Sequence, residues 1–131
     1  FENKKVTIAT DLGYIDDKLL MQMENSDILM LESNYDTETL KYNNKYPFVL
    51  KQRISGKNGH LSNDMASKAI THLCQKGVNN FILGHLSKEN NFPELAYQTV
   101  INELQGNNIS INSFNLSVAS RDKIDSMLEL A

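Results

Sequence analysis

Three strand-like segments in this sequence end in side chains that could carry acid–base or metal chemistry. Asp11 follows the β-branched run KVTIAT, Glu32 closes the apolar run DILMLES, and His85 follows the apolar run NNFILG. A fourth residue, His60, precedes the longest amphipathic segment. Carboxylates and imidazoles are the ligands that zinc and manganese sites use. The four residues therefore suggest a metal-assisted hydrolase, although acids and histidines are also common in loops.

The tetrapeptide GHLS occurs twice, at residues 59–62 and 84–87, in opposite contexts. The first copy precedes an expected helix, where an imidazole can serve an anionic substrate. The second follows an apolar run, where a neutral imidazole on a rigid strand end suits a metal ion. The two copies therefore sit in opposite structural contexts.

The spacing of apolar residues predicts strands that alternate with helices. We expect strands over 5–10, 27–33, 79–85 and 108–116, and helices over 16–25, 62–76 and 92–105, with two short helices between 36 and 57. This order predicts one α/β domain over residues 1–131, with a largely parallel sheet and flanking helices. Because later strands could run antiparallel, we expect the sheet to be mixed.

Composition limits the class of protein. A net charge of -3 excludes a globally basic nucleic-acid binder. The single cysteine, Cys74, allows no internal disulfide, fits a reducing compartment and should pack in the core, whereas His72 should be solvated. No apolar run approaches the ~18 residues of a membrane span, so we expect a cytoplasmic protein and no membrane partner. The chain opens on Phe1, which suggests a partial or processed chain.

A local basic segment lies between Glu32 and His60. Residues 41–57 contain no acid, and their three aromatic residues are interleaved with five basic ones, Lys41, Lys45, Lys51, Arg53 and Lys57. The segment could be a solvated helical face. Alternatively, it could border the site and neutralise a nucleic-acid backbone.

Four ordered motifs, ATDLG, ESN-x-D, GHLSN and GHLSKENN, resemble the C-terminal half of metallo-β-lactamase fold hydrolases, specifically the YycJ-like (WalJ-type) group. This resemblance implies half of an αβ/βα sandwich. It also implies a DNA exonuclease or phosphodiesterase with two divalent ions, zinc or manganese, in which Asp11 bridges the ions and His85 is a ligand. Tyr35 stands where the group's motif leads us to expect a histidine.

The tRNA 3′-processing endonucleases of the same superfamily carry a related glutamate and histidine pair. The matching residues here are Glu32 and His60, which the resemblance implies are catalytic: His60 as a proton donor or phosphate ligand, and Glu32 as the carboxylate that orients it. For substrate binding we consider Ser62, Asn63, Lys88, Asn90 and Asn91. Ser62 and Asn63 could instead cap a helix, and the other three could be polar loop residues.

The superfamily's H-x-H-x-D-H cluster does not occur in these residues, whose histidines are His60, His72 and His85. We therefore expect a partial metal site with weak or no metal occupancy. We also expect an apolar sheet face without its partner, which favours a homodimer or a swapped oligomer. The alternative functions are thioester or lactam hydrolysis in the same fold, and an inactive structural fragment.

Overall fold

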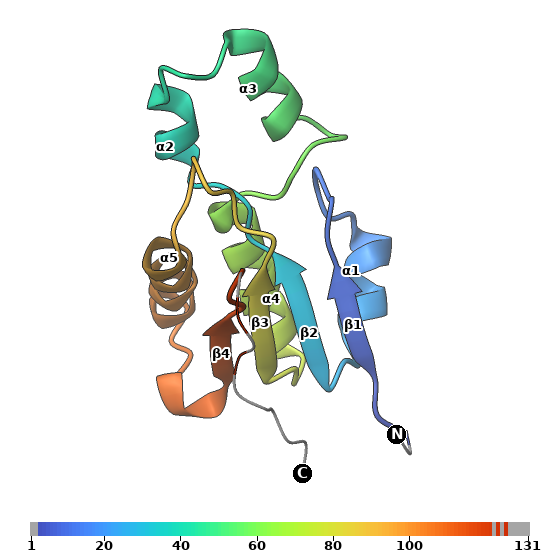
Figure 1. The fold of residues 1–131 in the computed structure, drawn as a ribbon. Coiled ribbons are helices and arrows are strands. Elements are labelled where there is room, and N and C mark those ends of the chain that lie inside the picture. Colours follow the sequence, from blue (N-terminus) through green and yellow to red (C-terminus); the bar gives the residue numbers. More distant parts are fainter. Residues whose placement is uncertain (1–2, 122, 124, 126–131) are drawn as a thin grey trace.

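The protein is an α/β structure in which the helices alternate with the strands of one sheet (Figure 1). The computed structural model describes residues 3–121, 123 and 125. The strands are β1 (Val6–Ala9), β2 (Ile28–Glu32), β3 (Asn80–Gly84) and β4 (Asn115–Val118). The helices are α1 (Asp17–Met23), α2 (Thr37–Tyr42), α3 (Phe48–Ser55), α4 (Asn63–Gln75) and α5 (Pro93–Gly106). The predicted α/β class and the two short helices before α4 are confirmed.

The sheet has the sequential order β1-β2-β3-β4, and every pairing among the described strands is parallel. The expectation of a mixed sheet is therefore wrong. Each of the first three strands is followed by a crossover that contains at least one helix and returns the chain to the same end of the sheet. Parallel crossovers are almost always right-handed, so a sequential order places α1, α4 and α5 on one face of the sheet, whereas α2 and α3 lie beyond its carboxyl edge. All four strands consequently end at the same edge.

The last strand begins later than predicted. The alternating pattern of residues 108–116 suggested a strand, but Ile111–Ser113 form a 3₁₀ turn, and the Ser110 hydroxyl accepts the Asn112 N–H at 3.2 Å. The strand begins at Asn115, whose N–H donates to the Asn79 carbonyl at 2.7 Å. Local serine and asparagine hydrogen bonds thus compete with the strand, as they commonly do in turns.

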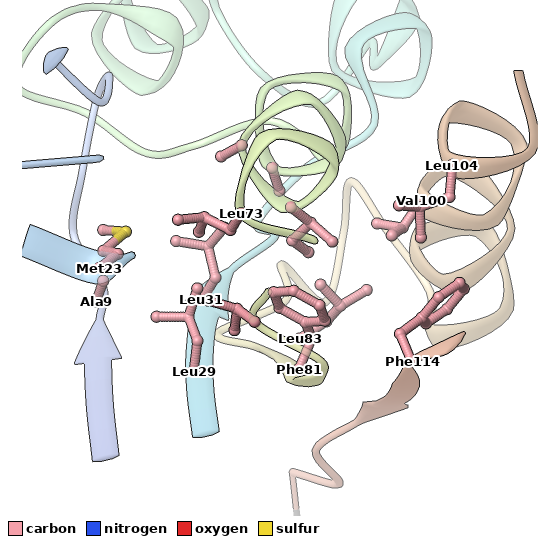
Figure 2. Packing of buried hydrophobic residues seen from close by; sticks show 14 of the residues in the cluster. Ala9, Met23, Leu29, Leu31, Leu73, Phe81, Leu83, Val100, Leu104 and Phe114 are labelled. Carbon is pink, nitrogen blue, oxygen red and sulfur yellow. The ribbon is translucent and has the colours of Figure 1, made fainter. Parts of the chain in front are cut away.

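The core lies between the sheet and helices α4 and α5 (Figure 2). Leu29, Leu31, Phe81 and Leu83 alternate along β2 and β3 and are at most 2% exposed. Cys74 packs against this core as expected, and burial raises the pKa of its thiol. His72, expected to be solvated, is instead half-buried, and its Nε2 lies 3.2 Å from Glu24 Oε1.

The opposite face of the sheet is apolar and poorly covered. Val6 and Ile8 on β1 are 61% and 68% exposed, and Ile28, Met30 and Ile82 on the same face are only partly buried. This confirms the predicted exposed apolar face. Within the described residues, no helix is long and apolar enough to cross a membrane.

Two glycines allow the end of α3 to approach the loops around it. A Cβ added to Gly13 would lie 2.0 Å from the Lys57 carbonyl oxygen, and one added to Gly59 would lie 2.2 Å from that of Ile54. Both obstacles are backbone atoms, which cannot rotate away as the end of a side chain can. These contacts bring the loop after β1 and the residue before His60 against the end of α3.

Gly59→Ala should therefore lower the free energy of unfolding by about 1–3 kcal/mol, because the backbone of α3 or of the loop must shift. Gly106→Ala is the matched control, since an added Cβ there meets no atom within 4 Å. At that helical position alanine should be neutral or stabilising by up to ~1 kcal/mol. Urea denaturation of both variants measures the difference, and equal stabilities would contradict the close approach at Gly59.

Candidate metal centre

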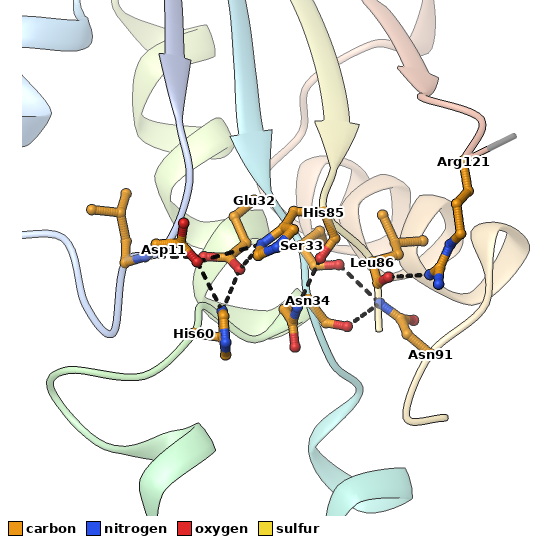
Figure 3. A network of polar contacts seen from close by, with 10 residues as sticks. Asp11, Glu32, Ser33, Asn34, His60, His85, Leu86, Asn91 and Arg121 are labelled. Atoms are coloured by element: carbon orange, nitrogen blue, oxygen red, sulfur yellow. Dashed lines mark hydrogen bonds and ion pairs between the residues drawn. The ribbon is translucent and has the colours of Figure 1, made fainter. Parts of the chain in front are cut away.

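Four side chains from separate segments meet at the carboxyl ends of the strands (Figure 3). Asp11 follows β1, Glu32 ends β2, His85 follows β3, and His60 lies between α3 and α4. Each offers one potential ligand atom, and the four atoms lie within 4.8 Å of one another. The expectation that the Asp11 and His85 side chains converge is therefore confirmed, whereas their role as ligands stays a prediction.

Glu32 lies at the centre of this cluster and is fully buried. Its Oε1 accepts the backbone N–H of Leu12 at 3.0 Å. Its Oε2 lies 2.7 Å from His60 Nδ1 and 2.6 Å from His85 Nδ1. The predicted pairing of Glu32 with His60 is thus present in the structure, but the same oxygen also holds His85.

The hydrogen bonds of Glu32 decide which ring nitrogens remain available. When Glu32 is ionised, its Oε2 can only accept hydrogen bonds, and the Nδ1 of His60 and the Nδ1 of His85 are then the donors. In a neutral ring, Nε2 then keeps its lone pair for a metal ion or a proton. A carboxylate behind the far nitrogen of a ligating histidine is a common arrangement in zinc sites. Glu32 is therefore suited to orienting imidazoles that act through Nε2.

Asp11 and His85 both have left-handed backbone conformations, with φ of 58° and 56°. This region costs a residue other than glycine about 1–2 kcal/mol, although Asp and His occur there more often than most residues. The conformation turns each side chain back toward the cluster directly after its strand. Asp11 Oδ1 lies 3.7 Å from His60 Nδ1 and 3.9 Å from His85 Nδ1, and its carboxylate is largely exposed.

The backbone of His60 is attached to α3 rather than to the sheet. Its N–H donates to the Ile54 carbonyl at 2.8 Å. The next residue, Leu61, is fully buried, and its carbonyl accepts the N–H of Asn34 at 2.8 Å. The rings of His60 and His85 lie with their centroids 5.3 Å apart and their planes tilted by 58°. The two GHLS segments therefore bring their histidines together from a helix end and from a strand end.

Most of the predicted substrate-binding side chains have partners inside the protein. Ser62 is the N-cap of α4, and its hydroxyl accepts the Met65 N–H at 3.1 Å. The Asn63 and Asn91 amides are buried and bonded to each other, and Asn91 also donates to the Ser33 carbonyl at 2.9 Å. Asn90 Oδ1 accepts from Asn43 at 2.7 Å. These bonds fix the loops around the site, and a role in substrate binding stays a prediction.

A groove of about 840 Å³ opens beside the two histidines. Lys88 lines this groove and is exposed. Of the predicted substrate-binding residues, it is the one whose charged side chain can reach a ligand in the groove. The lining also includes Tyr46 of the basic segment, together with Asn34 and Arg121, which the sequence reasoning did not select. Arg121 donates to the Leu86 carbonyl (Figure 3). The predicted strand ended at Leu116, whereas β4 ends at Val118. With the correct end, Arg121 would have been recognised as a charged residue that follows a strand.

Tyr35, at the position where a histidine was expected, does not belong to the cluster. Its side chain is 4% exposed, and residues 35 and 62 form an isolated parallel bridge. Burial raises the pKa of the phenol, so the group stays protonated and neutral near pH 7. Tyr35 thus joins the start of α4 to the end of β2 and contributes packing in place of a further imidazole.

The donor set fits a divalent metal ion. Two carboxylates and two imidazoles converge, and one carboxylate is largely exposed. Such nitrogen and oxygen ligands suit zinc and manganese. With three histidines in the whole sequence, one of them bonded to Glu24, the chain supplies two imidazoles to this position. The cluster can therefore hold an ion and can place an imidazole beside it.

Comparison with known proteins relates the chain to bacterial exodeoxyribonucleases. The chain is 40% identical over 103 residues to exodeoxyribonuclease WalJ of Streptococcus pneumoniae serotype 2 strain D39. The aligned region covers 79% of this chain and 38% of that protein. The protein of the same name from strain ATCC BAA-255 / R6 gives the same values. Exodeoxyribonuclease YycJ of Bacillus anthracis is 33% identical over 103 residues, with 79% and 39% covered.

The chain thus spans about two-fifths of the length of the curated relatives it matches. No family model and no solved structure matches the chain. The identity to the three relatives nevertheless extends over 103 residues, well beyond the four motifs. At 33–40% identity over 79% of the chain, these matches confirm the resemblance to the YycJ-like (WalJ-type) exodeoxyribonucleases.

Proposed function

We propose that the chain contributes part of the metal site of a metal-dependent DNA exonuclease. The observation that carries the proposal is the convergence of Asp11, Glu32, His60 and His85 at the carboxyl edge of a rigid parallel sheet. The names of the relatives support DNA as the substrate. In this proposal two divalent ions, zinc or manganese, occupy the site of the whole protein, with Asp11 and His85 among their ligands.

Bound divalent ions would polarise the scissile phosphate and lower the pKa of a bound water. The chain's own residues then have separate tasks. Asp11 supplies an exposed carboxylate between the two histidines, and Glu32 holds both rings by Nδ1. His60 protonates the leaving alkoxide from Nε2, while the buried carboxylate of Glu32 holds the opposite side of its ring at Nδ1. Lys88 and Arg121 offer positive charge to phosphates in the groove.

Thioester or lactam hydrolysis is the alternative within the same fold. The structure favours phosphodiester cleavage because a potential proton donor lies directly beside the potential ligands, and poor alkoxide leaving groups need such a donor. The basic segment lies on the same side of the molecule. A purely structural fragment would not require Asp11 and His85 to hold strained conformations that aim their side chains at a common point.

Asp11→Asn in the full-length protein should reduce both bound metal and nuclease turnover, because the amide keeps the size of the carboxylate but removes its charge. Metal content by elemental analysis and turnover on labelled DNA are the two measurements. Asp16→Asn is the matched control, since Asp16 caps α1 and asparagine caps helices equally well. Normal metal content and turnover in Asp11→Asn, or full activity in excess chelator, would refute the metal site.

His60→Ala should lower turnover by roughly 10²–10⁴-fold with metal content intact, the usual contribution of a positioned acid–base group. A phosphodiester with a better leaving group should recover much of this loss because it needs less protonation. His72→Ala is the matched control, since His72 contacts Glu24 outside the cluster. Loss of metal would make His60 a ligand instead, and unchanged turnover would leave it a structural role.

A further inference from the structure

The basic segment, residues 41–57, concentrates positive charge in an otherwise acidic chain. It holds five of the chain's 13 basic residues and none of its 16 acidic residues. Within residues 3–121, 123 and 125, Lys45 is the member paired with a carboxylate, that of Glu89 at 3.5 Å. The other four keep charges that no carboxylate of the described chain neutralises. Such a concentration favours a polyanionic partner.

Apolar and aromatic side chains are exposed within the same segment. Tyr42, Phe48 and Val49 are 68%, 71% and 74% exposed. Phe48 also borders a hollow of about 380 Å³ between α2 and α3, together with Lys41 and Lys51. The Lys51 ammonium donates to the Lys41 carbonyl at 2.8 Å, which holds one charge at the rim. An aromatic ring and two ammonium groups thus surround a space large enough for a nucleobase.

The segment is continuous with the candidate metal centre. Tyr46 and Ile54 line the groove that also contains His60 and His85. The backbone of Ile54 holds the backbone of His60, and Asn43 is bonded to Asn90. Figure 1 shows α2 and α3 beyond the carboxyl ends of β1 and β2. A polymer bound along this segment would therefore extend into the groove.

We propose that α2 and α3 bind the unpaired end of a DNA strand. Lys41 and Lys51 neutralise backbone phosphates, and Phe48 stacks against a base in the hollow. Single strands are commonly bound by this combination of a basic surface and exposed aromatic rings. The inference rests on the proposed nuclease function, because the groove joins the segment to the metal centre. An anionic membrane is the competing partner, and it would not require continuity with that groove.

The test is binding of the full-length protein to a labelled single-stranded oligonucleotide in chelator, measured by fluorescence anisotropy at several salt concentrations. Each phosphate contact contributes about 0.7 to the slope of log affinity against log salt. Replacing Lys41 and Lys51 together by alanine should therefore reduce that slope by about 1.4. Phe48→Ala should weaken binding roughly 5- to 100-fold with little change of slope, and Phe48→Tyr should restore it.

Matched controls separate a local surface from general charge. Lys18→Ala with Lys68→Ala changes the net charge equally at exposed positions on α1 and α4, and Ile111→Ala removes another exposed apolar side chain. These controls should bind as the wild type does. The inference would be overturned if both lysine pairs changed the salt dependence of binding equally, or if Phe48→Ala bound the oligonucleotide as tightly as the wild type. So would binding to phosphatidylserine vesicles that depends on Lys41, Lys51 and Phe48 while the oligonucleotide does not bind.

The outcome is independent of the nuclease proposal because chelator prevents metal-dependent cleavage during the binding assay. If DNA binding shows the expected dependence while Asp11→Asn retains metal and turnover, the proposed role of Asp11 in the metal site fails and the binding surface stands. If Asp11→Asn loses both and the lysine and Phe48 variants bind normally, the nuclease proposal stands and this inference is wrong.

Discussion

The architecture of the site depends on one buried carboxylate. Glu32 has no exposed surface, and a buried charge without partners costs several kcal/mol. Its partners come from three other segments: the Leu12 N–H after β1, the His60 ring before α4 and the His85 ring after β3. Since none of these lies on β2 itself, satisfying Glu32 requires the surrounding loops to close over the edge of the sheet.

The rigid sheet makes this closure possible. Parallel register aligns Glu32 with Gly84, one residue before His85, and the end of β1 lies beside β2. The left-handed conformations at Asp11 and His85 then turn both side chains toward Glu32, at a cost of about 1–2 kcal/mol each. Four buried core residues on β2 and β3 help to stabilise the sheet that carries this strain. Among the described non-glycine residues, Asn3 and Asn108 also have a positive φ, but Asp11 and His85 are the two that reach the cluster.

The sequence predicted the α/β class, the long helices and the residues that converge, because apolar periodicity and strand-end acids are local signals. It did not predict the parallel direction of β4 or its start at Asn115, which depend on pairing with β3 and on competing turns at Ser110. Nor did it predict that Asn63 and Asn91 bond to each other, since only the fold brings residues so far apart in the chain together. Arg121 was not predicted either, because the predicted last strand ended too early.

The shared carboxylate changes how the two GHLS segments should be understood. Glu32 orients His60 and His85 alike, so any difference in function must come from the backbones that carry them. His85 is fixed at the end of a central strand, where position is rigid and suits a metal ligand. His60 is held by the carbonyl of Ile54 at the end of α3. A substrate that shifts α3 would therefore move the His60 ring relative to His85, which would couple the proposed DNA binding on the basic segment to the placement of the proposed proton donor.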